Sequence, residues 1–221
     1  MLKAKPISFR DTTIKSGFWY KRQQINAHNT LESVYRRFEE TGRFAALRLD
    51  GSVKPHIFWD SDVAKWMEGA AYLLAKAPDP ALEEKMDRMI DTIAAGQEQC
   101  GYFNSYFQAE EPEQKFCRRT DHELYCAGHL MEAAVAYQEV TGKDQFLKMM
   151  CRYADYIEKR FKLENSAKFT TPGHEEIELA LVRLYHATGE KRYLDLSLFF
   201  INQRGKNDKD FVNFYDFANA K

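Results

Sequence analysis

The chain has 221 residues, of which 44% are hydrophobic, and a formal net charge of −1 from 32 basic and 33 acidic side chains. That size and composition predict one folded domain, residues 1–221, with a substantial core, and exclude a disordered chain. The balanced charge argues against a nucleic-acid partner, which would require a clustered positive surface.

No stretch approaches the roughly 18 consecutive apolar residues of a membrane span, so no membrane partner is expected. The first residues, MLKAKPISFRDTT, contain no apolar core of a secretory signal. The four cysteines, Cys100, Cys117, Cys126 and Cys151, include no CxxC pair, and without an export signal they are expected to be reduced. Together these features favour the cytoplasm.

The elements predicted along the chain are helices. Residues 1–20 are expected to be an extended lead-in, and residues 43–59, which contain Gly51 and Pro55, a loop. Apolar side chains at a 3.6-residue period, together with capping residues, predict seven helices. These helices span residues 21–40, 60–77, 80–99, 122–140, 144–161, 174–186 and 191–202.

Several helix ends carry capping signals. Asp60 or Asp62 can cap the second helix, and Asp121 the fourth. Asp79 can cap the third helix, with Pro80 at its first position. Thr-Gly pairs follow three of the helices, at Thr41-Gly42, Thr141-Gly142 and Thr188-Gly189, where glycine can take the left-handed conformation that ends a helix.

Two helical hairpins repeat one another. EVTGKDQFLKM at 139–149 aligns with HATGEKRYLDL at 186–196, 47 residues later. Repeated αα-hairpins of this length form either an open solenoid or a closed toroid. The long loops with aromatic and histidine residues all precede the first helix of a hairpin, in HIFWDSD, GYFNSYF and KFTTPGHEE. These loops would lie together at one end of the helices, the decorated end, and the short links within hairpins at the other. This asymmetry favours an all-α toroid with its site at the decorated end.

Two histidines begin successive hairpins at that end. His122 and Glu123 are expected in the first turn of the fourth helix, and His174 in that of the sixth, so both imidazoles would converge on the axis. A neutral imidazole both donates and accepts hydrogen bonds, which suits sugar hydroxyls. The alternatives are capping glutamates beside surface histidines, or a metal site of His122, Glu123 and Cys126, for which no fourth ligand is apparent. His129 is expected to be hydrogen-bonded in the core.

Two other loops carry candidate ligand-binding groups. FWDSD places Trp59, Asp60 and Asp62 at a helix start, where the aspartates are either paired carboxylates or N-caps. GYFNSYF mixes aromatic rings with Asn104, a combination that suits sugar stacking and hydroxyl contacts. The alternative is a buried anchor of the loop.

The chain resembles the family 127 glycoside hydrolases, the β-L-arabinofuranosidase family of bacteria. The resemblance covers residues 8–205 and rests on FWDSDVAKWMEGAAY, IAAGQEQCGYFNSYF, DHELYCAGHLMEAAVAYQEVTGK and PGHEEIELALVRLYHATGEKRYLDL, in that order. It implies an (α/α)6 barrel followed by β-sandwich domains. It also implies a sugar pocket that includes His122 and His174, with Trp59, Asp60 and Asn104 near its rim.

The same resemblance implies retaining hydrolysis in which three cysteines and a glutamate hold zinc, one cysteine is the nucleophile and another glutamate is the acid/base. None of the four cysteines lies in a matching motif, so no catalytic residue, metal ligand or cofactor is assigned to this chain. Seven helices are also too few for a twelve-helix barrel. The expectation is the N-terminal half of such a barrel, with residues 206–221 beginning the missing remainder.

Three accounts of the chain follow from this expectation: a fragment, one piece of a split enzyme, or a half-barrel that pairs with a second copy. The implied partners are a carbohydrate substrate and either the C-terminal half or that copy. The main function hypothesis is the N-terminal portion of an arabinofuranosidase acting on arabinose-containing plant glycans, inactive alone. The alternatives are a non-catalytic carbohydrate-binding or scaffold module, and an enzyme like the unsaturated uronyl hydrolases that uses Asp60 or Asp62.

Overall fold

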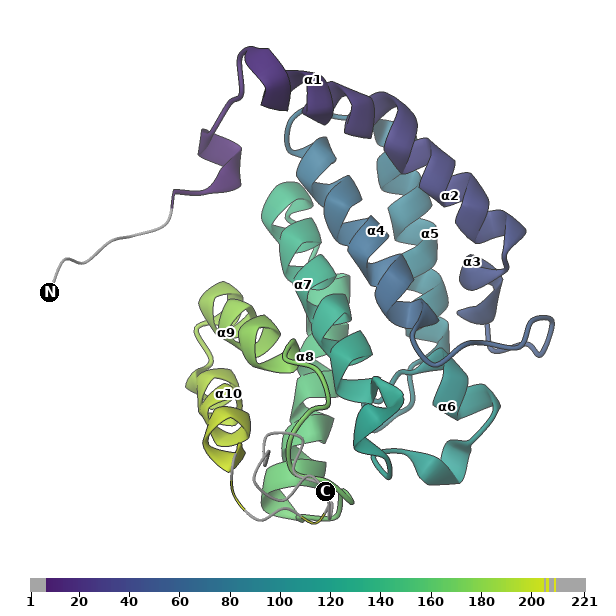
Figure 1. The fold of residues 1–221 in the computed structure, drawn as a ribbon, viewed down its shortest axis with the longest axis vertical. Helices are drawn as coiled ribbons and strands as arrows, with labels where there is room; N and C mark the ends of the chain where they lie inside the picture. Colours follow the sequence, from purple (N-terminus) through teal and green to yellow (C-terminus); the bar gives the residue numbers. More distant parts are fainter. Residues whose placement is uncertain (1–6, 205, 207–208, 210–221) are drawn as a thin grey trace, which may run out of the picture.

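The computed structural model describes residues 7–204, 206 and 209, and within these residues the regular elements are all helical (Figure 1). The α-helices are α1 (Gly17–Ile25), α2 (Leu31–Glu40), α3 (Arg43–Ala46), α4 (Trp59–Leu74), α5 (Pro80–Gly96), α6 (Ser105–Ala109), α7 (Glu123–Thr141), α8 (Gln145–Glu158), α9 (Ile177–Thr188) and α10 (Lys191–Gln203). The first six residues and most of the expected start of a remainder, 206–221, lie outside the described residues.

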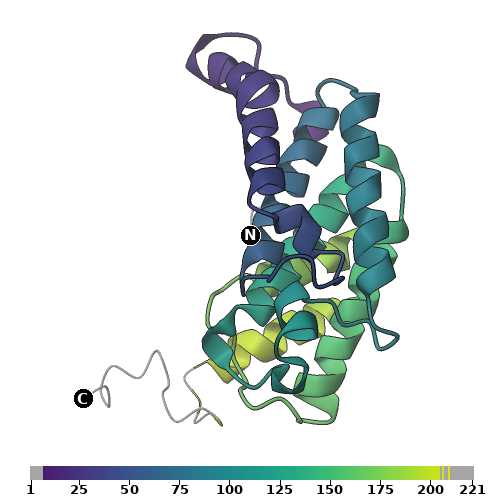
Figure 2. The same ribbon diagram turned by 90° about the vertical axis from the view of Figure 1, so that its right-hand side faces the viewer.

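The helices form three consecutive hairpins, α4–α5, α7–α8 and α9–α10. The first helices of the hairpins pack against one another, with α7 between α4 and α9, while α8 and α10 each pack against the preceding helix (Figure 1). Figure 2 shows α5 and α8 side by side in a second layer. Two layers of helices, with the first helix of every hairpin in the same layer, confirm the predicted αα-hairpin toroid portion.

The hairpin turns follow the predicted chemistry. Gly142 (φ 75°) and Gly189 (φ 76°) end α7 and α9 in the left-handed conformation, and each backbone N–H donates to a carbonyl in the last turn of its helix. The Asp79 side chain accepts hydrogen bonds from two backbone N–H groups of α5, which begins at Pro80. These turns leave only a few residues between the helices, so the second helix of each hairpin returns antiparallel to the first.

The predicted caps of two helices and the predicted start of a third are wrong. Asp60 and Asp62 do not cap α4, because that helix begins at Trp59 and both lie inside its first turn. His122 occupies the N-cap position of α7 without a capping side-chain hydrogen bond, while Asp121 pairs with Arg118. Helix α9 begins at Ile177, three residues after the expected start at His174.

Further differences lie in the predicted lead-in and loops. Helix α1 begins at Gly17, and a π-helical segment, Asn26–Thr30, joins it to α2, so the first predicted helix starts earlier than expected. The predicted loops contain the short helices α3 and α6. The third predicted helix ends at Gly96 rather than at residue 99.

A continuous core joins the two layers. Its largest fully buried side chains are Tyr102, Tyr137, Tyr153, Tyr193, Phe103, Phe107, Phe116, Phe146, Phe169, Phe200, Leu47 and Met67. Among the described helices, none combines the length and the apolar composition of a membrane span.

Candidate functional site

The decorated ends of α4, α7 and α9 meet at a pair of imidazole rings. The ring centroids of His122, at the N-cap position of α7, and His174, in the loop before α9, lie 4.7 Å apart. The Phe58 ring, at the start of α4, lies 5.7 Å from the His122 ring. Three separate loops thus bring their aromatic side chains together, as the hairpin repeat predicts.

Tyr125 lies in the first turn of α7, close to the two histidines. Its ring centroid is 5.8 Å from that of His122 and 5.4 Å from that of His174. Lys65 of α4 donates to the Tyr125 hydroxyl at 2.8 Å. A cation, a phenol and two imidazoles therefore share one end of the inner layer, which consists of α4, α7 and α9.

The backbone of His122 is unusual for a residue with a side chain. Its φ of 63° and ψ of 13° are left-handed, a conformation that costs about 1–3 kcal/mol for such a residue and is often found at functional sites. Burial and the neighbouring His174 ring lower the pKa of His122 below its ordinary value. A lowered pKa favours the neutral imidazole, which can donate with one nitrogen and accept with the other.

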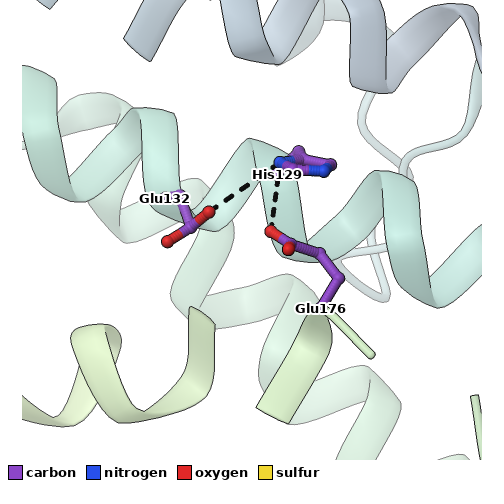
Figure 3. Close-up of side chains that lie close together, drawn as sticks. All are labelled: His129, Glu132 and Glu176. Atoms are coloured by element: carbon purple, nitrogen blue, oxygen red, sulfur yellow. Dashed lines mark ion pairs between the residues drawn. The ribbon is translucent and has the colours of Figure 1, made fainter. Parts of the chain in front are cut away.

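A second polar group lies further along the same helices (Figure 3). His129 Nδ1 is 3.0 Å from Glu176 Oε1 and 3.8 Å from Glu132 Oε2. Burial lowers the pKa of His129 to about 4, with a further contribution from Lys65. Burial and the adjacent Glu132 carboxyl raise the pKa of Glu176 to about 8.

Arg183 of α9 forms hydrogen bonds with Glu132 of this group and with two residues of α4. Its guanidinium donates to Glu68 at 2.6 Å, to Glu132 at 2.8 Å and to the Tyr72 hydroxyl at 3.0 Å. The inner helices α4, α7 and α9 are therefore joined by charged and polar side chains as well as by the apolar core. This network is absent from the sequence-based predictions, although the i, i+3 spacing of His129 and Glu132 on one helix is a visible signal.

The structure places two predicted pocket residues in buried hydrogen bonds. Both carboxyl oxygens of Asp60 accept from Ser105, one from its backbone N–H at 2.7 Å and one from its hydroxyl at 2.5 Å. Both carboxyl oxygens of Glu123 accept as well, from the Tyr102 hydroxyl and from the Phe116 backbone N–H, each at 2.7 Å. Burial raises the pKa of Asp60 to about 6 and that of Glu123 to about 8.

Trp59 and Asn104 make contacts with other residues. The guanidinium of Arg43 sits 5.1 Å from the centre of the Trp59 ring. Asn104 is buried and accepts from the Phe107 backbone N–H at 3.0 Å, which caps α6. Of the predicted residues, the structure therefore brings together His122 and His174, and it uses Asp60, Asn104 and Glu123 to hold the surrounding loops.

The four cysteines are free thiols that differ in exposure. Cys126, in α7, is buried, and its thiol lies 3.5 Å from the Ile57 carbonyl, whereas Cys100 is exposed in the turn after α5. Glu123 and Cys126 also point to separate hydrogen-bond partners, which removes the alternative metal site with His122. Within the described part of the chain, the one group of three potential metal ligands is His129, Glu132 and Glu176.

Comparison with known proteins identifies the family. Residues 11–216 match the model of the beta-L-arabinofuranosidase, GH127 catalytic domain. The chain belongs to glycoside hydrolase family 127. A curated family relative, the non-reducing end beta-L-arabinofuranosidase of Bifidobacterium longum subsp. longum, is 43% identical over 171 residues, which cover 75% of this chain and 26% of that protein.

Solved family 127 structures share the fold. A β-L-arabinofuranosidase from Geobacillus stearothermophilus is similar with a TM-score of 0.84 at 40% identity, over 88% of this chain and 33% of that one. A second GH127 β-arabinofuranosidase gives a TM-score of 0.83 at 33% identity, over 91% of this chain and 34% of that one. This family 127 chain thus spans about a quarter to a third of the length of these relatives.

Proposed function

We propose that this chain forms the N-terminal wall of the sugar pocket of a retaining β-L-arabinofuranosidase that acts on the non-reducing ends of arabinose-containing plant glycans. The observation that carries the proposal is the pair of facing imidazoles, His122 and His174, at the decorated end of the inner helices. Family membership and the names of the similar enzymes support the substrate class.

The histidine pair suits a furanose sugar. A neutral His122 can form a hydrogen bond with a sugar hydroxyl through Nε2, because its Nδ1 is buried. His174, which is exposed at the loop surface, can contact the opposite edge of the same sugar ring. The Phe58 and Tyr125 rings flank the pair and supply apolar faces for the sugar carbons. In this proposal, the pocket loops are supported by Trp59, Asp60, Asn104 and Glu123.

We assign binding rather than bond cleavage to these residues. The zinc chemistry that the family resemblance implies needs three cysteines and a glutamate at one point, and the thiols of this chain belong to different surroundings. In the full-length enzyme, zinc would be held by residues of other segments. The 221-residue chain is therefore expected to bind arabinofuranosides without hydrolysing them.

An apolar groove supports the expectation of a partner. It has a volume of about 730 Å³, lies between α1, α2 and α4, and is lined by residues that include Trp19, Leu31, Phe38, Trp66 and Tyr72. We propose that the C-terminal half of the barrel covers it, since the family relatives are three to four times as long as the matched region. Light scattering tests this: a monomer that becomes a one-to-one complex with the C-terminal half supports it, and a stable homodimer closed over Trp19 contradicts it.

A cytoplasmic location stays a prediction. All four cysteines are free thiols, which supports a reducing compartment. Fractionation of cells that produce the protein would test it, and recovery in the culture medium would contradict it.

The deciding experiment separates binding from hydrolysis. Saturation-transfer NMR would measure the affinity of the purified chain for methyl β-L-arabinofuranoside, and an aryl β-L-arabinofuranoside would report hydrolysis, with and without zinc and reductant. We expect binding that falls at least tenfold in His122→Ala and in His174→Ala, and no hydrolysis. The matched control, His186→Ala, removes an exposed imidazole at the other end of α9 and should keep wild-type affinity.

Two results would contradict the proposal. Equal affinity in wild type, His122→Ala and His174→Ala would remove the sugar-binding role of the pair. Zinc-dependent hydrolysis by this chain alone would show that its own cysteines and glutamates carry catalysis.

A further inference from the structure

Three potential metal ligands from two helical hairpins point at one place inside the inner layer. His129 and Glu132 lie one turn apart on α7, and Glu176 is the residue that directly precedes α9 (Figure 3). One ligand atom from each side chain lies within 4.8 Å of the others. The sequence alone predicted no metal ligand in this chain, because Glu176 reaches the other two only through the packing of α9 on α7.

The separations match those around a bound cation. A zinc ion with nitrogen and oxygen ligands at about 2.0–2.2 Å in tetrahedral geometry places its ligand atoms about 3.4 Å from one another. His129 Nδ1 lies 3.0 Å from Glu176 Oε1 and 3.8 Å from Glu132 Oε2, on either side of that value. Small rotations of the two carboxylates would therefore suffice to bind the ion.

One polar atom of this group, His129 Nε2, is buried without a partner in the described structure. His129 Nδ1 and Glu176 Oε1 are buried as well, make no hydrogen bond, and face each other as an ion pair at 3.0 Å. The Glu176 side chain is only 8% exposed. Buried polar atoms without partners are rare and costly, so each one calls for a specific explanation.

The surroundings hold the ligands in place. Arg183 binds Glu132 Oε1 at 2.8 Å, which leaves Oε2 turned toward His129. Gly128 lets the start of α9 approach closely, because a Cβ atom at that position would lie 2.7 Å from Glu176 Cγ. Partners that orient the ligating groups in this way are typical of metal sites.

We propose that His129 Nδ1, Glu132 Oε2 and Glu176 Oε1 bind a divalent transition-metal ion of the zinc class, with a fourth position open to water. An imidazole with two carboxylates favours such an ion over Ca²⁺ or Mg²⁺, which prefer oxygen ligands alone. The two carboxylates neutralise its charge. The nearby cations are already engaged, Lys65 with Tyr125 and Arg183 with Glu68 as well as Glu132.

The test is the affinity of the purified chain for Zn²⁺, measured in reductant by competition with a chromophoric chelator. Glu176→Gln should lower the affinity at least tenfold, and the matched control Glu175→Gln, its exposed neighbour, should leave it unchanged. Glu132→Gln should lower it as well. Thermal unfolding in EDTA would confirm that each variant folds, so that loss of affinity is not loss of structure.

Cobalt spectra distinguish this site from adventitious binding by thiols. Co²⁺ bound by His129 and the two glutamates should show weak visible bands without a thiolate-to-metal charge-transfer band. Equal Zn²⁺ affinity in Glu176→Gln and Glu175→Gln, or a charge-transfer band that disappears in Cys100→Ser, would overturn the proposal. The sugar-binding proposal rests on other residues, so either one can fail while the other holds.

Discussion

Asp60 and Ser105 are joined by two hydrogen bonds in the interior of the protein. The Asp60 carboxyl accepts from the Ser105 backbone N–H at 2.7 Å and from its hydroxyl at 2.5 Å, and the Asp60 residue is 2% exposed. This pair fastens the start of α4 to the start of α6. The two hydrogen bonds compensate in part for the poor solvation of the buried Asp60 carboxylate.

The pH dependence of stability should change when Asp60 becomes asparagine. Burial raises the pKa of Asp60 from 3.8 to about 6, so the folded state holds the proton more tightly than the unfolded state does. The contribution of Asp60 to stability is therefore full below about pH 4 and is lost as the pH rises to about 6, by about 3 kcal/mol.

Asp60→Asn keeps both partners, since its amide can accept from the N–H and donate to the hydroxyl of Ser105. Urea unfolding at pH 4 and pH 7 would measure the effect. We expect the difference in unfolding free energy between wild type and Asp60→Asn to shift in favour of the variant at pH 7. An unchanged difference at the two pH values would show that Asp60 ionises alike in both states.

The sequence predicts the hairpins well because their ends are encoded locally. A Thr-Gly pair ends a helix through the conformational freedom of glycine, and Asp79 with Pro80 begins one through side-chain capping. The convergence of His122 and His174 follows from the same local signals. Once two hairpins repeat, residues at equivalent positions come to the same end of the layer.

The errors arise where a tertiary contact outweighs a local signal. Asp60 resembles an N-cap by sequence, but Ser105, a partner 45 positions away, draws it into the core inside the first turn of α4. Helix α9 begins at Ile177 rather than His174, which moves Glu176 to the position that faces His129. No periodicity within one segment reveals such a partner in another.

The approach of α9 to α7 should be sensitive to a single methyl group. A Cβ atom at Gly128 would lie 2.7 Å from Glu176 Cγ and 3.1 Å from the Ile177 backbone nitrogen, and backbone cannot move aside without shifting the helix. Gly128→Ala should therefore destabilise the fold by about 1–3 kcal/mol. Thermal or urea unfolding would measure it.

Gly69→Ala is the matched control for this substitution. Gly69 also lies inside an inner helix, α4, but nothing lies within 4 Å of a Cβ atom there. Alanine should stabilise that position by about 0.5–1 kcal/mol, since it is the better helix former. Equal effects of the two substitutions would mean that α7 and α9 are not in tight contact at Gly128.

The left-handed backbone of His122 predicts an unusual order of stabilities. Glycine adopts φ 63° without strain and alanine does not, whereas both substitutions remove the imidazole equally. His122→Gly should therefore be about 1 kcal/mol more stable than His122→Ala, the reverse of the order inside a regular helix. Urea unfolding of the two variants checks this, and a more stable His122→Ala would show that the residue is not left-handed in solution.

Arg183 should contribute more to stability than surface ion pairs of similar geometry. Its side chain is 25% exposed, and it meets Glu68 and Glu132, whose side chains are 17% and 10% exposed. Arg183→Met leaves these carboxylates without their counter-ion in a poorly solvated place, which should cost about 3 kcal/mol at neutral pH.

A double-mutant cycle isolates the pair that Arg183 makes with Glu68. Because Glu68→Gln removes one of the charges left uncompensated by Arg183→Met, the double variant should be less unstable than the sum of the two single variants. We expect a coupling of about 1–3 kcal/mol, measured by urea unfolding in EDTA. The same cycle on Lys191 and Asp195, whose side chains are 75% and 40% exposed, should give about 0.3–0.5 kcal/mol. Similar couplings for the two pairs would mean that the network around Arg183 is solvated and does not hold the inner helices together.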